Sequence, residues 1–156
     1  MNDWYLLSVI LHVLAAMLWV GGMGFFALVV VPVVRRTSSK EEARKILRET
    51  GTRFATIGWV ALGVLVATGV GNLAFRGNLP ALARAEFWHS PFGAIFAAKM
   101  SVVALVLVLS LLHSLDARRP SPTDAARARA TSLGRLTFVL STVIVVLAVM
   151  LVRGPP

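Results

Sequence analysis

Four long apolar runs constrain this chain more than any other feature of its sequence. They extend over about residues 4–34, 54–75, 91–115 and 133–152. A helix needs roughly 20 apolar residues, rising 1.5 Å each, to cross ~30 Å of hydrocarbon. Because each run reaches that length, the sequence predicts an all-α fold: an integral membrane bundle of four transmembrane helices, with residues 1–156 as a single transmembrane domain.

The composition is typical of a membrane protein and argues against a nucleic-acid binder. Hydrophobic residues make up 57% of the chain and charged residues only 15%, whereas a small soluble domain needs a more polar surface. The net charge of +9 would suit nucleic acid, but the basic residues lie in short segments between the apolar runs. We therefore expect no nucleic-acid partner. The lipid bilayer is the expected partner, with a second copy of the chain or a larger membrane complex as further candidates.

The distribution of lysine and arginine predicts the orientation in the membrane. These residues gather in segments 35–53 and 116–132, whereas segment 76–90 holds only Arg76 and Arg84. An excess of basic residues marks the loops on the cytoplasmic side. We therefore expect both basic segments in the cytoplasm and both termini on the outer side. The expected location is the inner (plasma) membrane of a bacterium, as a multi-pass protein.

Two local signals refine the basic segments. The run from Ser38 to Glu42 contains a capping-box pattern, which predicts the start of a helix, and Gly51 is placed to end that helix. The first basic segment is therefore expected to hold one short helix. In the second segment, the proline-rich run 118–124 predicts a turn.

A few polar residues interrupt the apolar runs. His12 and Lys99 are ionisable, and Thr68 and Asn72 are polar without charge. An ionisable group inside a membrane is costly, so it needs a partner or a purpose. Counted from the outer ends of their spans, His12 and Lys99 both lie ~12 Å deep, and Thr68 and Asn72 fall in the same leaflet. The sequence therefore predicts a polar cluster, contributed by three helices, in the outer leaflet.

Histidine and methionine are the candidate metal ligands, because the chain has no cysteine. His12 lies in the predicted cluster, His89 precedes the third span, and Met150 is near the same level in the fourth span. His113 is ~21 Å from Lys99 along one helix, which places it near the cytoplasmic face. If His12 and His113 both bind metal, they belong to two sites.

Simpler structural roles compete with these functional ones. His12 could only hydrogen-bond a neighbouring helix, and Lys99 could extend its amine to the membrane surface. Thr68 and Asn72 could join helices by hydrogen bonds, and His113 is close enough to the interface for a structural role. Two further residues are candidates for a cofactor site: Trp19, which lies deeper than the other tryptophans, and Gly22, which could make room for a flat ligand.

Several stretches resemble the copper resistance protein D (CopD) family of membrane domains. They are Leu11-His12-Val13-Leu14-Ala15-Ala16-Met17-Leu18-Trp19-Val20-Gly21-Gly22, Arg53-Phe54, Thr68-Gly69, Ser90-Pro91-Phe92-Gly93, Lys99 and His113. Their order and spacing cover nearly the whole chain. The resemblance implies a helical membrane protein linked to copper uptake or resistance. More distantly, the chain is similar to the HemJ-type four-helix membrane proteins, which are associated with haem. That group pairs a histidine and a lysine, which would correspond to His12 and Lys99, but this chain departs from its pattern after Trp19.

Three functions follow as alternatives. The first is copper binding or transport in the outer leaflet, because imidazole and thioether groups suit Cu(I). The second is a membrane redox protein with haem b, in which His12 would ligate the iron and Lys99 would pair with a propionate. The third is a non-catalytic accessory subunit of a membrane complex. Whether the protein is an enzyme is left open.

Overall fold

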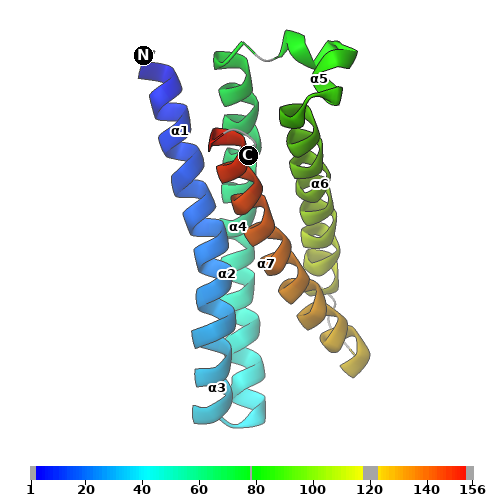
Figure 1. Cartoon of the computed structure of the whole chain (residues 1–156). Helices are drawn as coiled ribbons and strands as arrows, with labels where there is room; N and C mark the ends of the chain where they lie inside the picture. The colour runs from blue at the N-terminus through cyan, green and yellow to red at the C-terminus, as the bar shows by residue number, and fades with distance from the viewer. Residues whose placement is uncertain (1–2, 78, 118–122, 154–156) are drawn as a thin grey trace. The chain divides into compact units, whose positions relative to one another are not determined.

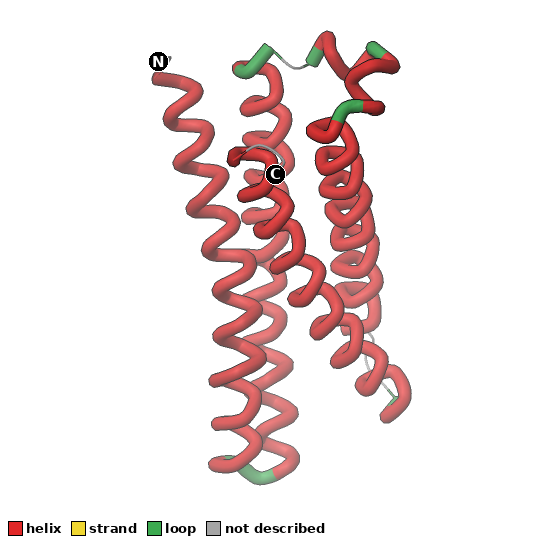
Figure 2. The backbone as a smooth tube through the Cα atoms, viewed as in Figure 1, coloured by secondary structure: helices red, strands yellow, loops and turns green. Residues whose placement is uncertain are grey.

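A computed structural model describes residues 3–77, 79–117 and 123–153. These residues are helical apart from short turns and contain no strand (Figure 2). Within them, four helical stretches are long and apolar enough to cross a membrane (Figure 1), which confirms the predicted all-α membrane protein. The chain divides into two compact units after Arg76. The expectation of a single domain stays a prediction.

The first unit opens with one uninterrupted helical run from Asp3 to Thr37. Its parts are α1 (Asp3–Ala16), η1 (Met17–Gly21), α2 (Gly22–Phe25), η2 (Phe26–Val30) and α3 (Val31–Thr37). The segments η1 and η2 are π-helical turns. Pro32 lies two residues after the end of η2. A proline has no N–H and its ring crowds the carbonyl four residues earlier, here that of Leu28, so the turn before it widens.

Helix α4 (Lys40–Phe75) returns along the first run after only two residues, Ser38 and Ser39. The capping box is confirmed: the Ser39 hydroxyl accepts from the Glu42 N–H, and the Glu42 carboxylate accepts from the Ser39 N–H at 3.0 Å. The predicted end at Gly51 is wrong, because α4 continues through it. A glycine weakens a helix, but the helix ends there only if the residues after the glycine are also non-helical. Here the residues after Gly51 form a transmembrane span.

Two glycines and three aromatic rings hold this hairpin together. The indole of Trp19 lies against Gly58 of α4, and the ring of Phe54 lies against Gly22 of the first run. Phe54 stacks between Trp19 and Phe26, with ring centroids 6.4 and 6.2 Å apart and interplanar angles of 13°. Each glycine thus accepts a ring from the opposite helix, as small residues do where membrane helices approach closely.

The second unit begins with short elements before its two long helices. A 3-10 turn, η3 (Pro80–Ala83), leads to α5 (Ala85–His89) and then to α6 (Pro91–Ala117). Ser90 caps α6, because its hydroxyl accepts from the Gly93 N–H at 3.0 Å and Pro91 supplies the fixed φ that suits a first helical residue. A side chain at Gly93 would overlap the carbonyl oxygen of Phe87, so only glycine fits this turn.

Helix α7 (Asp124–Arg153) packs against α6. It begins well before the predicted fourth span, so residues 124–132 are helical. Of the predicted turn at 118–124, residues 118–122 lie outside the described residues, and Asp124 already belongs to α7. The buried side chains of the two helices are Val106, Leu109 and Ser110 of α6, and Thr137 and Ser141 of α7, together with Asp116 near the end of α6. Large apolar side chains cover the outer surfaces of the helices, as lipid contact requires.

Candidate functional site

His12 and Thr68 meet within the first unit. The Nδ1 atom of His12 lies 2.8 Å from the Thr68 hydroxyl oxygen, which in turn lies 2.6 Å from the Val64 carbonyl oxygen. A carbonyl only accepts, so the Thr68 hydroxyl gives its single hydrogen to Val64 and must accept from His12. The hydrogen-bond network therefore assigns the proton of neutral His12 to Nδ1 and the ring's lone pair to Nε2.

Ser8 adds to this pair from one turn earlier in α1. Its hydroxyl donates to the Thr68 carbonyl oxygen at 3.4 Å. Both side chains pack over glycines of α4: an added methyl group would lie 3.6 Å from His12 Cε1 at Gly69 and 3.4 Å from Ser8 Oγ at Gly71, which are ordinary contact distances. The side chains of α1 and α4 therefore interlock around the imidazole.

Asn72 lies one turn beyond Thr68 on α4. Its Oδ1 atom is buried and has no hydrogen-bond partner within the described residues. Together with Ser8, His12 and Thr68 it forms a polar stretch on the interface between α1 and α4. The predicted proximity of His12 and Thr68 is thus present as a direct contact, and Asn72 offers a further acceptor nearby.

The two residues predicted to shape a cofactor pocket are closely packed. Trp19 is 9% exposed and lies on Gly58. The space beside Gly22 is filled by the Phe54 ring, so a flat ligand at Gly22 would have to displace that ring. The roles of Trp19 and Gly22 in binding a cofactor stay predictions.

The remaining predicted residues belong to the second unit. Lys99 is half-buried on the third turn of α6, His89 is exposed on α5, and Met150 is 36% exposed on α7. His89 precedes α6 and His113 lies near its other end, ~33 Å further along the helix. These two histidines therefore cannot ligate one ion. That His89, Lys99 and Met150 join His12 in one site stays a prediction.

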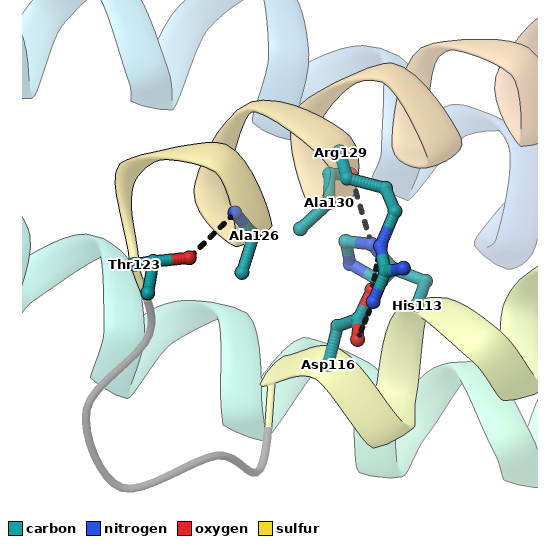
Figure 3. A network of polar contacts seen from close by, with 6 residues as sticks. All are labelled: His113, Asp116, Thr123, Ala126, Arg129 and Ala130. Atoms are coloured by element: carbon teal, nitrogen blue, oxygen red, sulfur yellow. Dashed lines mark hydrogen bonds and ion pairs between the residues drawn. The ribbon is translucent and has the colours of Figure 1, made fainter.

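His113 takes part in a network between the end of α6 and the start of α7 (Figure 3). Its Nδ1 atom lies 3.0 Å from the Ala130 carbonyl oxygen, so Nδ1 donates and Nε2 again carries the lone pair. Close by, the carboxylate of Asp116 is buried and accepts two hydrogen bonds from Arg129, the Nε–Oδ2 bond being 2.8 Å. This bidentate geometry fixes the guanidinium in place.

No group of three or more histidine, cysteine, aspartate or glutamate side chains in the described part of the chain could hold a metal ion. Cu(I) accepts a small number of soft ligands such as imidazole and thioether.

Three polar residues were not predicted from the sequence: Ser8, which bonds to Thr68, and the buried Ser110 and Thr137. Serine and threonine are common in apolar helices and give no signal individually. Ser8 could have been found from its spacing, because it lies four residues before His12 and thus on the same helix face.

Comparisons with known proteins agree with the resemblance noted from the sequence. A family model described as copper resistance protein D matches residues 48–151. An uncharacterized protein of Aquifex aeolicus (strain VF5) is 33% identical over 153 residues, which make up 95% of each chain. No solved structure matches. The similarity to HemJ-type proteins is not shown by these comparisons.

Proposed function

Because the chain belongs to the copper resistance protein D family, we propose that it binds copper inside the membrane, with His12 Nε2 as a ligand. Copper would be the ion that the protein transports or binds, and the protein would lie in the inner membrane of a bacterium. The basic segments 35–53 and 116–132 would face the cytoplasm, so that His12 would lie in the outer leaflet.

The observation that carries this proposal is the hydrogen bond between His12 and Thr68. A histidine that binds metal through one ring nitrogen generally donates the hydrogen of the other to a fixed acceptor, which sets the tautomer and the ring orientation. Thr68 supplies that acceptor from a neighbouring helix. The lone pair needed for a metal therefore resides on Nε2.

Cu(I) needs at least one further ligand. His89 and Met150 are the candidates in the outer leaflet, and Lys99 would repel a cation unless its amine were neutral. His113, at the far end of α6, would serve a separate site.

A competition titration of the purified full chain in lipid nanodiscs tests the proposal. Cu(I) is added under anaerobic, reducing conditions in the presence of a chromogenic chelator. His12→Ala should abolish tight binding. Thr68→Val keeps the side-chain shape and removes the acceptor, so the affinity should fall by about 10- to 100-fold. Thr56→Val is the matched control, because the Thr56 hydroxyl bonds only within α4, to Thr52.

Equal affinities of the native chain and His12→Ala would refute the assignment. An absorption spectrum of the same preparation, before and after dithionite, separates the alternatives. A Soret band that shifts on reduction would replace copper with haem b as the bound group. Lack of both haem and copper binding would favour the accessory subunit.

A further inference from the structure

Three cations of α4 line one open hollow on its surface. Arg44, Lys45 and Arg48 surround a space of about 450 Å³ together with Glu49, in the part of α4 that runs beside α3 (Figure 1). All four side chains are exposed, whereas Ala43, which the helical spacing puts on the opposite side, is 7% exposed. The hairpin itself therefore leaves the hollow open to its surroundings.

The charges around the hollow are not balanced within the protein. Three positive groups and one negative group leave a net charge of +2, and within residues 3–77, 79–117 and 123–153 none of the four side chains forms an ion pair. Arg44 and Arg48 are four residues apart, and like charges at that spacing destabilise a helix. Lys45 and Glu49 have the same spacing, but in the order that gives the weaker attraction. A bound anion would therefore stabilise this part of α4.

The position of the hollow along α4 places it near the lipid headgroups. The apolar part of α4 begins at Phe54, which packs against Gly22 and Trp19 of the first helical run. Arg48 precedes Phe54 by ~9 Å along the helix and Arg44 by ~15 Å. The headgroups extend about 5–8 Å beyond the hydrocarbon. Membrane helices also tilt by about 20° on average, and long basic side chains extend to polar partners, so lipid phosphates are within reach of these cations.

Apolar side chains continue the same face of α4 into the membrane. Trp59 and Val66 lie 11 and 18 residues after Arg48, which is close to three and five full turns of the helix. Both are exposed, at 36% and 46%. A lipid whose phosphate lies in the hollow can therefore place an acyl chain along this face, whereas a soluble anion would gain nothing from it.

We propose that Arg44, Lys45 and Arg48 bind the phosphate of an anionic phospholipid. A guanidinium donates two parallel hydrogen bonds to phosphate oxygens, and the lysine ammonium adds a compact positive charge. Basic clusters beside a membrane span attract anionic lipids, and each cation near the surface strengthens binding about fivefold. Thr68, which is bonded to His12, lies ~30 Å beyond Arg48 along α4, so this site does not depend on copper binding at His12.

Native mass spectrometry of the full chain in detergent, titrated with phosphatidylglycerol or with phosphatidylcholine of the same acyl chains, tests the proposal. The native chain should bind phosphatidylglycerol more tightly than phosphatidylcholine. Changing all three cations of the hollow to glutamine should weaken phosphatidylglycerol binding by about 100-fold and leave phosphatidylcholine binding unchanged. The matched control changes Arg35, Arg36 and Lys40 to glutamine. It removes the same charge from the same hairpin, but none of these residues lines the hollow, so the preference for phosphatidylglycerol should remain.

Glu49→Gln provides a second test that keeps every basic residue, and with them the signal for membrane orientation. It removes the negative charge from the hollow, so phosphatidylglycerol should bind up to about fivefold more tightly. The proposal is overturned if Glu49→Gln leaves that affinity unchanged, or if the control variant loses the lipid preference as fully as the hollow variant. Displacement of the lipid by inorganic phosphate, but not by chloride at equal ionic strength, would assign the hollow to a soluble anion and overturn it as well.

Discussion

Replacing Gly58 by alanine tests the packing that holds α4 against the first helical run. The new Cβ would lie 2.5 Å from Cζ3 and 3.1 Å from Cε3 of Trp19. Carbon atoms in contact prefer about 3.5–4.0 Å, so the indole would have to move by roughly 1 Å. Trp19 is 9% exposed and stacked on Phe54, so it has little room. Overpacking of this kind lowers the free energy of unfolding by about 1–3 kcal/mol.

Gly63→Ala is the matched control on the same helix. A Cβ at Gly63 meets no atom within 4 Å, so this variant gains helix propensity, worth up to about 1 kcal/mol, without a clash. Gly58→Ala gains the same helix propensity, so the free energies of unfolding of the two variants should differ by the overpacking cost alone, about 1–3 kcal/mol. Equilibrium unfolding in mixed micelles with increasing SDS, followed by circular dichroism, measures them.

A double-mutant cycle identifies the cause. Trp19→Phe removes the ring edge that the new Cβ would meet. Gly58→Ala should therefore lower the free energy of unfolding less in the Trp19→Phe background than in the native chain, which is a favourable coupling energy. The packing argument fails if Gly58→Ala is as stable as Gly63→Ala. It fails also if Gly58→Ala lowers the free energy of unfolding equally with and without Trp19→Phe.

Three further predictions concern other contacts. Gly93→Ala should sharply reduce the yield of folded protein in detergent, measured by size-exclusion chromatography, because the added Cβ overlaps the Phe87 carbonyl oxygen. Arg129→Gln should lower the free energy of unfolding more than Asp116→Asn does, because only Arg129→Gln leaves the buried carboxylate of Asp116 without its cation; equal losses in equilibrium unfolding would contradict the reasoning. Ser39→Ala should cost about 1 kcal/mol through the lost helix cap, seen as a lower midpoint of thermal unfolding.

Hydropathy alone sufficed to predict the four membrane helices, because every backbone polar group in lipid must be bonded within a helix. The ends of the helices were harder to predict. The charged residues of 40–53 were expected to form a separate short helix ending at Gly51, yet they belong to α4, because the helix that starts at the Ser39 cap is extended by the apolar residues that follow. The π-helical turns depend on local carbonyl geometry before Pro32 and on packing, which periodicity does not record.

The candidate site was predicted only in part. Counting residues from the membrane surface placed His12 and Thr68 at one depth, and they are in contact. The same method cannot tell which face of a helix a residue occupies when nearly all faces are apolar. Ser110 and Thr137 were not predicted for that reason. The burial of a neutral hydroxyl can be recognised only once the helix that covers it is known.

The length of α4 has a consequence for the charges it carries. Its 36 residues make a rod of about 54 Å, and tilting that rod into ~30 Å of hydrocarbon would need roughly 55°, beyond the 0–40° range of membrane helices. Helix α4 therefore extends past the hydrocarbon, and the charged residues of its first turns, Lys40 and Arg44 among them, lie at the level of the headgroups or beyond it. At physiological salt the Debye length is about 8 Å, so these cations act on charges close to them and only weakly across the hydrocarbon.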